Sequence, residues 1–429
     1  MKSLEIEYKW SVLDMIGVLV QVLSLVSGLM VNFLTPLIFG IEQYGLFIKA
    51  NILVYVFHRF SDVSSESLIA LNSEGSIFLQ SLIFNVFYFF VFLGGAQYFD
   101  IGNPLLLAGM LLSSSVLLTL YSQKRIQAVM IFLLSVVSVF IVLAGLLWGG
   151  RVTLSIEQLM IFSTYPSAVS GFLALVWFSR RELLQVSSYS ALWRALAILP
   201  RMVSLTLVFN LLTNFLPYIA TKILMPREIG ILRVMLAVVQ SVSSIFPLNI
   251  KQIFSSMVGS GNKQRLYASL MQVSAVYFLL LACGLIFVTY IYSPLQAYVR
   301  LLSMLPLFFW SMLTERYLQS CFMGNRLLAT NLIFSFGILV GSIFCNTLDA
   351  LIMLYVVSIF GYCAALIRAA EVPVPLRYYV LGVVCLLQTV LIEVSLPLAF
   401  LLALITVAGF LLYGPSVRTD IQTLRGEIK

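Results

Sequence analysis

The chain has 429 residues, of which 61% are hydrophobic and only 10% carry a charged side chain. Soluble domains are about half apolar and about a quarter charged, so this balance excludes a water-soluble globular protein. The 25 Lys and Arg residues outnumber the 17 Asp and Glu residues, giving a net charge of +8. In a polytopic membrane protein this excess collects in cytoplasmic loops, so we expect no nucleic-acid partner.

The apolar runs predict fourteen membrane-spanning helices, because runs of about 17–25 residues cross a hydrocarbon layer about 30 Å thick. The predicted spans are 11–35, 45–68, 77–96, 103–121, 127–147, 157–178, 197–223, 229–255, 267–292, 297–320, 327–346, 349–367, 378–394 and 396–413. The last two are short, so a single re-entrant pair, leaving twelve crossings, is the alternative. The five cysteines lie in or near apolar runs at no metal-ligand spacing, and we expect neither disulfides nor a metal site.

The loops between these spans are basic on one side only. The basic loops and the C-terminal tail contain Lys124, Arg125, Arg180, Arg181, Arg194, Lys263, Arg265, Arg326, Arg368, Arg377, Arg418, Arg425 and Lys429. The opposite loops offer little beyond Arg151 and Arg227. This asymmetry predicts that both termini are cytoplasmic and that the number of spans is even.

A short signature occurs twice along the chain. The first copy runs from Gly28 to Phe47 and the second from Asn210 to Leu232. Each consists of an apolar helix with polar residues, a short turn ending in Gly, and a second apolar helix. Membrane proteins built from a repeated unit tend to place a substrate path where the copies meet.

This repeat predicts an all-α polytopic membrane protein with two lobes of six helices. The predicted N-terminal lobe covers residues 1–178, a cytoplasmic linker covers 179–196, and the C-terminal lobe covers 197–368. Residues 369–429 then contain the last two helices and a cytoplasmic tail. Since six is even, both lobes enter the membrane with the same polarity, and their axis should lie along the membrane normal.

Polar residues recur on one face of the first span and of its repeat, the seventh span. They include Asp14, Gly28 and Asn32 in the first span and Asn214 in the seventh. Helix packing explains the small residues such as Gly28 equally well. We therefore expect Asn32 and Asn214 to line the path.

The second span carries a stripe of polar and charged residues at helical spacing. This stripe consists of Asn51, Tyr55, His58, Arg59, Asp62 and Glu66, with Lys49 nearer the outer end. A charge at mid-bilayer costs at least about 2.5–3.5 kcal/mol, so these groups must pair with one another or face water. Asp62 is spaced to pair with Arg59 or with His58. We expect Lys49, His58, Arg59 and Asp62 to face the lumen, whereas Glu66 suits an ion pair near the headgroups.

The eighth span has a similar stripe, running from Arg233 through Gln240 to Lys251. At 1.5 Å per residue these two cations lie about 27 Å apart along a helix, close to the hydrocarbon thickness. Lys222, just before this span, and Arg201, near the cytoplasmic end of the seventh, add positive charge. Anchoring at the membrane interface is the alternative for Lys222 and Lys251.

Positive charge exceeds negative charge over these spans, which predicts a cavity for an anionic substrate. Arg and Lys are both suited to binding phosphate groups. Asp14 and Asp62 are the candidates for coupling to H⁺ or Na⁺, because a desolvated carboxylate binds a cation more readily. We expect no cofactor.

At the first copy of the signature the sequence resembles a known family. Thr35-Pro36, the loop from Gly40 to Phe47 and the following helix ending in Phe60-Ser61-Asp62 are similar to the start of polysaccharide-biosynthesis transporters. These belong to the multidrug/oligosaccharidyl-lipid/polysaccharide (MOP) exporter superfamily, and the length and cationic spans look most like the Wzx-type O-antigen flippases. The acidic–Gly pattern that usually follows the second helix in this family is incomplete here, because the stretch from Asp62 to Glu66 lacks a Gly.

The resemblance implies two six-helix bundles that form a V around a cavity open to each side in turn. It also implies an undecaprenyl-diphosphate-linked oligosaccharide as substrate, moved from the cytoplasmic to the periplasmic leaflet of a bacterial inner membrane. Membrane lipids, an O-antigen polymerase and a chain-length regulator are the implied partners.

Three other functions stay open at this point. A multidrug antiporter of the MATE type would favour an acidic cavity, opposite in sign to the one predicted. A lipid II flippase is normally longer, although fourteen spans would fit it. An O-antigen polymerase or ligase carries a large periplasmic loop, which this sequence does not contain. Its single histidine, His58, and its few carboxylates also offer no nucleophile–base spacing, so we expect no enzyme.

Overall fold

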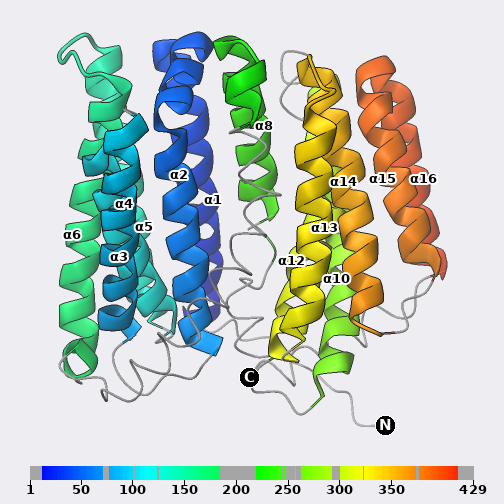
Figure 1. Ribbon diagram of the computed structural model, residues 1–429. Helices are drawn as coiled ribbons and strands as arrows, with labels where there is room; N and C mark the ends of the chain where they lie inside the picture. The colour runs from blue at the N-terminus through cyan, green and yellow to red at the C-terminus, as the bar shows by residue number, and fades with distance from the viewer. Residues whose placement is uncertain are drawn as a thin grey trace.

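A computed structural model of the chain describes residues 12–70, 77–99, 102–122, 125–183, 219–243, 246, 257, 262–291, 300–321, 323–372 and 376–413. Within these ranges every regular element is a helix, which confirms the predicted all-α fold. Figure 1 shows the helices running roughly parallel in two bundles, with α8 between them.

The first bundle contains six helices in chain order. They are α1 (Val12–Phe39), α2 (Ile41–Ala70), α3 (Ile77–Phe99), α4 (Pro104–Ser122), α5 (Ile126–Trp148) and α6 (Ile156–Leu183). Gly40 separates α1 from α2 with a φ of 87°, a conformation that glycine adopts without steric cost. Asn103 caps α4 by accepting a hydrogen bond from the Leu105 amide at 2.9 Å.

The described part of the second bundle follows the same pattern. It consists of α8 (Pro226–Ser243), α10 (Lys263–Ile291), the 3₁₀ turn η2 (Arg300–Met304), α12 (Leu305–Ser320), α13 (Gly324–Ser342), α14 (Leu348–Ala369), α15 (Leu376–Val394) and α16 (Leu396–Tyr413). The structure describes residues 300–320 of the predicted span 297–320, as the 3₁₀ turn η2 followed directly by α12. Pro306 lies in the first turn of α12, where its missing amide hydrogen is not needed, so the α-helix begins there.

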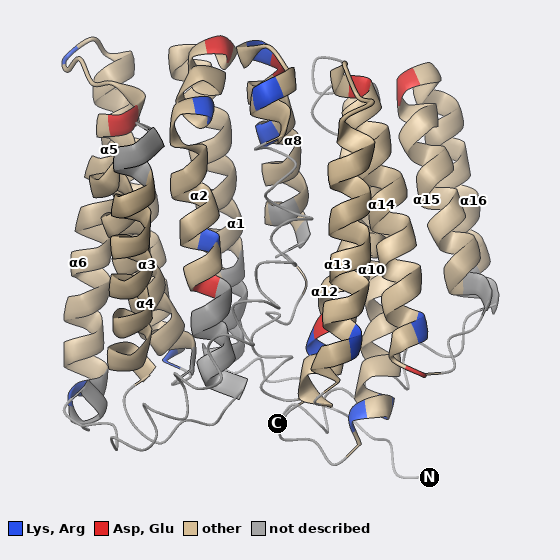
Figure 2. Cartoon of the chain, viewed as in Figure 1, with Lys and Arg blue, Asp and Glu red and all other residues tan. Residues whose placement is uncertain are grey.

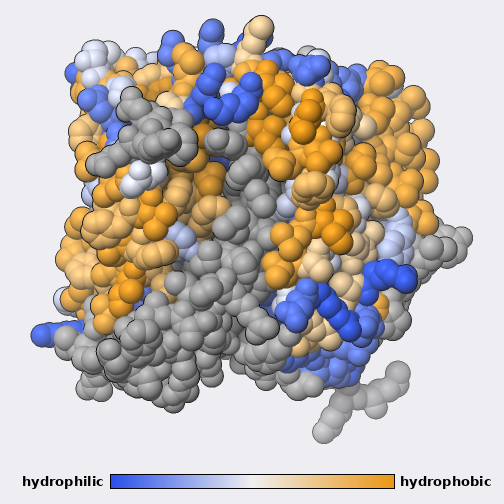
Figure 3. Space-filling model, viewed as in Figure 1, coloured by the Kyte–Doolittle hydropathy of each residue, from blue (hydrophilic) through white to orange (hydrophobic). Residues whose placement is uncertain are grey.

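Eight of the described helices are long and apolar enough to cross a membrane, namely α1, α3, α4, α5, α6, α10, α13 and α14. The apolar parts of α15 and α16 are shorter, Tyr378–Val394 and Leu396–Gly409. Large hydrophobic side chains such as Phe90, Trp177 and Phe336 are exposed on the outside of the bundles. Figure 3 shows hydrophobic residues along the sides of both bundles and hydrophilic ones gathered toward the ends. This distribution is that of a multi-span membrane protein.

The two bundles touch most closely where α2 and α8 begin. A Cβ atom on Gly45 would lie 1.7 Å from the carbonyl oxygen of Pro226, and one on Gly230 would lie 2.5 Å from the carbonyl oxygen of Ile41. Ile41 and Pro226 are the first residues of α2 and α8, so the contact is reciprocal. The two glycines also occupy equivalent places in the two copies of the sequence signature. We call this end of the interface the glycine end.

We expect Gly45→Ala or Gly230→Ala to force the bundles apart at the glycine end. The obstructing atoms belong to the backbone, so the added carbon must move from 1.7 Å to a normal contact of about 3.5–4.0 Å. The measurement is the distance between spin labels at the exposed positions Glu42 and Arg227, with the native cysteines replaced. Gly45→Ala should lengthen the main distance by about 2 Å, and Gly230→Ala, whose added carbon starts 2.5 Å from the Ile41 oxygen, by about 1–1.5 Å.

Gly337→Ala is the matched control, because nothing lies within 4 Å of a Cβ at that position on α13. An unchanged distance distribution in both interface variants would show that the two glycines do not limit how closely the bundles approach.

Candidate functional site

Arg233 of α8 enters the first bundle about one helical turn beyond Gly230. Its guanidinium carbon lies 4.9 Å from the centre of the Tyr55 ring of α2, a cation–π contact. The guanidinium also lies within hydrogen-bonding reach of the Tyr44 hydroxyl of α2. A cation from one bundle is therefore held by two aromatic side chains of the other.

Asn32 fixes one of these aromatic side chains. The Tyr44 hydroxyl donates to Asn32 Oδ1 at 3.0 Å, and Asn32 Nδ2 donates to the Gly28 carbonyl at 2.8 Å. Because the hydroxyl proton is directed to Asn32, the lone pairs of Tyr44 Oη are available to Arg233. Asn32 was predicted to line the path. In the structure it binds Tyr44, which in turn lies next to Arg233.

One N–H donor of the Arg233 side chain is not used by the described residues. It is half-buried, and its Nε atom is buried with no hydrogen-bond partner within the part of the chain that the structure describes. An unsatisfied buried donor costs about 1–3 kcal/mol, so this N–H would gain from an acceptor brought by a ligand.

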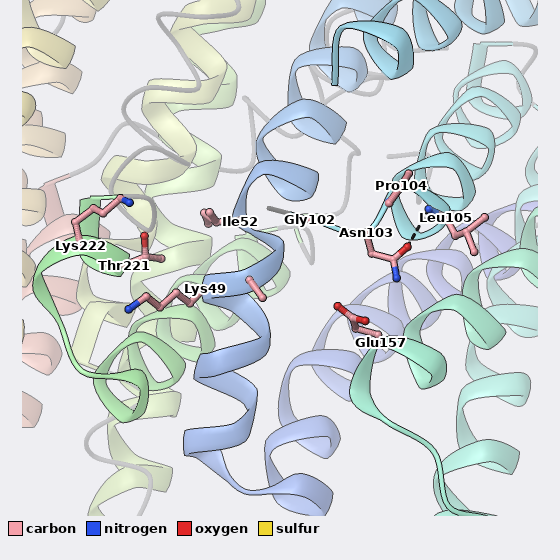
Figure 4. A pocket seen from close by; sticks show the side chains of 10 residues that line it. Lys49, Ile52, Gly102, Asn103, Pro104, Leu105, Glu157, Thr221 and Lys222 are labelled. Carbon is pink, nitrogen blue, oxygen red and sulfur yellow. Dashed lines mark hydrogen bonds between the residues drawn. The ribbon is translucent and has the colours of Figure 1, made fainter. Parts of the chain in front are cut away.

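Lys49 and Lys222 add two cations at the glycine end. They line one pocket of about 680 Å³ together with Thr221, Asn103 and Glu157. Lys49 belongs to α2, whereas Lys222 precedes α8, so each bundle contributes one ammonium group. Both lysine side chains are exposed. Figure 4 shows the two lysines together on one side of the pocket, with Glu157 and Asn103 on the other.

Glu157, at the start of α6, is engaged within its own bundle. Asn51 Nδ2 donates to Glu157 Oε1 at 2.9 Å, and Asn51 Oδ1 accepts from the Asn103 amide at 3.0 Å. Asn51 has non-helical backbone angles, φ −111° and ψ 16°, which mark a kink in α2. Asn51 belongs to the polar stripe that we predicted on this helix. Because of the kink, its side chain binds residues of the first bundle instead of continuing that stripe.

Arg59 and Asp62 lie farther along α2, Arg59 about 21 Å beyond Gly45 at 1.5 Å per residue. Arg59 Nη1 is 3.4 Å from Asp62 Oδ2, which confirms the predicted i, i+3 pair. The other Asp62 oxygen accepts a hydrogen bond from Ser114 of α4. Asp62 is thus bound within the first bundle, and its role in ion coupling stays a prediction. His58, on the same helix, is half-buried and also interacts with neighbouring groups.

The remaining predicted site residues are not placed. Arg201, Asn214 and Lys251 lie outside the described residues, and so do the side chains of Asp14 and Gln240. The structure therefore gathers Asn32, Lys49, Lys222 and Arg233 at the glycine end. Figure 2 shows basic residues together with acidic ones where α2 and α8 begin, and a second group of charged residues near the other end of α2 and on α12.

No sequence pattern predicted an ion cluster in the second bundle, where a buried arginine pairs with two more exposed carboxylates. Arg300 of η2 is 8% exposed, its Nη1 lies 2.5 Å from Asp349 Oδ1, and its Nη2 pairs with Glu393. Asp349 begins α14 and Glu393 ends α15, so the cluster ties α15 to the rest of the bundle. Since the three residues are far apart in sequence, no local spacing could reveal them.

Comparison of the structure with known protein structures identifies the fold of this chain. No protein-family model and no curated protein matches the chain. A MOP superfamily transporter from Pyrococcus furiosus, described as having a binding pocket of reversed polarity, aligns with a TM-score of 0.55 and 13% identity over 89% of this chain and 95% of that one. A MATE structure in complex with MaL6 aligns with a TM-score of 0.52 and 14% identity, over 89% and 95%.

These similarities extend over most of both chains. The chain has the fold of MATE and other MOP superfamily transporters.

Proposed function

We propose that the chain transports an anionic lipid-linked oligosaccharide between its two bundles. The observation that carries this proposal is the cross-bundle position of Arg233, whose Nε is a buried donor with no partner among the described residues. Lys49 and Lys222 line a pocket at the same end of the interface. Glu157, which also lines this pocket, accepts a hydrogen bond from Asn51. The described charges at this end are mixed, with Glu42, Glu157 and Glu228 beside four cations, and the two pocket lysines and Arg233 are the groups that an anion would contact.

A diphosphate is the anion that suits this set of donors. A guanidinium offers paired N–H donors to phosphate oxygens, and the two ammonium groups act as point charges beside it. The pocket of about 680 Å³ lies within the usual range of about 300–1,000 Å³ for ligand sites. Together with the resemblance to O-antigen flippases, these features favour an undecaprenyl-diphosphate-linked O-antigen repeat unit as the substrate.

On this proposal the protein lies in a bacterial inner membrane with both termini in the cytoplasm, and it moves its substrate to the periplasmic leaflet. The path would open to each side in turn as the bundles move. An O-antigen polymerase and a chain-length regulator would act on the delivered substrate.

The main alternative is a multidrug antiporter of the MATE type. The Pyrococcus furiosus transporter is described as having a pocket of reversed polarity, which suggests a different function for that protein. Pocket polarity thus differs among proteins of this fold. In the present chain the described cations at the bundle interface favour an anionic cargo over a cationic drug.

Charge reversal at the interface should abolish transport. We expect Arg233→Glu or Lys49→Glu to lower surface display of O-antigen at least about tenfold, the effect of losing about 1.4 kcal/mol of binding. Arg233→Lys should retain part of the activity, because it keeps the charge but loses the paired donors. The measurement is polymer display in cells that lack their own flippase, normalised to the amount of protein in the membrane.

Arg151→Glu makes the same charge change in an exposed turn outside the site and should leave display unchanged. Normal display by stable Arg233→Glu and Lys49→Glu proteins would contradict a cationic path for the substrate.

A diphosphate should also shield the two pocket lysines. We expect undecaprenyl diphosphate to reduce acylation of Lys49 and Lys222 by an amine-reactive reagent several-fold in purified protein, because the bound anion covers both ammonium groups. Peptide mass spectrometry measures the labelling of each lysine. Lys263, whose ammonium group donates to the Ser320 carbonyl at 2.6 Å, is the internal control. Equal labelling of both pocket lysines with and without the lipid would argue against the pocket as the binding place.

A further inference from the structure

The pocket at the glycine end has two walls with different chemistry. Lys49 and Lys222 lie on one side, where they suit a diphosphate. Asn103, just before α4, and Glu157, in the first turn of α6, lie on the other side (Figure 4). Among the described residues no lysine or arginine forms an ion pair with Glu157. Because a carboxylate repels phosphate, this second wall suits a different part of a ligand.

Asn103 has one polar atom that no described residue uses. Its Oδ1 accepts hydrogen bonds from the amides of Leu105 at 2.9 Å and of Leu106 at 3.3 Å, which fixes the orientation of the side-chain amide. The Nδ2 atom on the other side of that amide donates to none of the described residues. Figure 4 shows this nitrogen on the side of Asn103 that faces Glu157. The second wall thus contains a fixed N–H donor.

Glu157 supplies an acceptor to the same wall. Asn51 Nδ2 donates to Glu157 Oε1 at 2.9 Å, and Asn51 Oδ1 accepts from the Asn103 backbone amide at 3.0 Å. Asn51 is fully buried at the kink of α2, so one amide holds both pocket residues in place. The other carboxylate oxygen, Glu157 Oε2, bonds to no described residue and is not among the buried atoms. It is therefore open to a ligand.

A hydroxyl group is the ligand group that suits an unused donor and an unused acceptor on one wall. A hydroxyl can accept from Asn103 Nδ2 and donate its own proton to Glu157 Oε2. A diphosphate ester has no proton to donate, and the two lysines across the pocket repel an amine. The apolar side chains of Ile52 and Leu105 also line the pocket and can pack against the C–H groups of a sugar ring.

We infer that Asn103 and Glu157 form a saccharide subsite beside the diphosphate. The protein then binds a sugar-bearing lipid diphosphate more tightly than the bare lipid diphosphate. A site built to hydrogen-bond a hydroxyl discriminates against ligands that lack it, because its polar groups then stay unpaired. This inference rests on the proposed function, since the two lysines must hold the diphosphate for the sugar to reach the second wall.

Binding of short-chain lipid diphosphates tests the subsite. The probes are farnesyl diphosphate and the same lipid carrying one sugar, which is glucose, galactose, N-acetylglucosamine or N-acetylgalactosamine. Isothermal titration of the purified full chain in detergent micelles gives the Kd of each probe. In the wild type we expect at least one sugar to tighten binding about tenfold over bare farnesyl diphosphate, which corresponds to about 1.4 kcal/mol.

Two conservative variants each remove one hydrogen-bonding atom of the subsite. Glu157→Gln keeps an oxygen for Asn51 but puts an N–H donor in place of the unused oxygen. Asn103→Ser keeps a cap for α4 but loses the Nδ2 donor. Either variant should reduce the advantage of the sugar to about threefold or less. Bare farnesyl diphosphate should bind Asn103→Ser as before, and Glu157→Gln at least as tightly, because a negative charge has been removed. A merely structural defect would weaken both kinds of probe.

Glu228→Gln is the matched control, because it removes the same charge at the glycine end from a residue that does not line the pocket. The Glu228 carboxylate accepts from the Met225 amide at 3.0 Å, and a glutamine oxygen can still accept there. This variant should keep the full advantage of the sugar.

Two results would overturn the subsite while leaving the diphosphate site intact. One is that bare farnesyl diphosphate binds the wild type and no sugar improves its binding. The other is that the advantage of the sugar is the same in the wild type and in both variants. If bare farnesyl diphosphate does not bind the wild type, the diphosphate site of the proposed function is wrong, and the subsite with it. If one variant does not fold, the other gives the same comparison.

Discussion

The close approach of α2 and α8 determines where the cations of this protein lie. With hydrogen as the only side chain at Gly45 and Gly230, each helix start packs directly on the backbone of the other. Arg233 follows on α8 and reaches the Tyr55 ring only because the helices are this close. A similar approach recurs between α1 and α8, where a Cβ on Gly28 would lie 2.7 Å from Ser241 Oγ. Small residues let membrane helices approach closely, and here that approach also puts a guanidinium against the other bundle.

The hydrocarbon surroundings explain why the positive charge at this interface is not cancelled. Charged groups inside a membrane must have partners or face water, and two carboxylates of the first bundle have partners within that bundle. Glu157 accepts from Asn51, and Asp62 accepts from Ser114 and pairs with Arg59. Arg233 has an aromatic ring in place of a carboxylate, so its full charge remains available to a ligand. A few such pairings therefore decide which charges at the interface between the bundles stay without an opposite charge.

Hydropathy and local spacing were enough to predict the features that depend on neighbours along the chain. The all-α fold followed from the length of the apolar runs, and the Arg59–Asp62 pair followed from their i, i+3 spacing. The repeat also pointed to Gly45 and Gly230, although the pattern alone does not show that the two glycines meet. Features that depend on position within a helix were harder to predict, because the kink at Asn51 redirects its side chain and the α-helical part of the predicted span 297–320 begins only next to Pro306.

Contacts between distant segments could not be predicted from these patterns. Arg300 joins Asp349 and Glu393, and Glu315 joins Tyr362 and Asn331, through residues that no periodicity relates. Each member taken alone resembles an ordinary polar residue at a helix end or within a helix. Only the packing of the helices shows that these polar groups come together.

One cation of α8 joins the two bundles at the glycine end. Arg233 binds the Tyr55 ring, a contact worth about 0.5–2 kcal/mol. A ligand can shift an equilibrium between two states only by its difference in affinity for them. On the proposed function, an anion that takes Arg233 from Tyr55 must offset this contact, so binding of the anion and the approach of the bundles are linked through one guanidinium group.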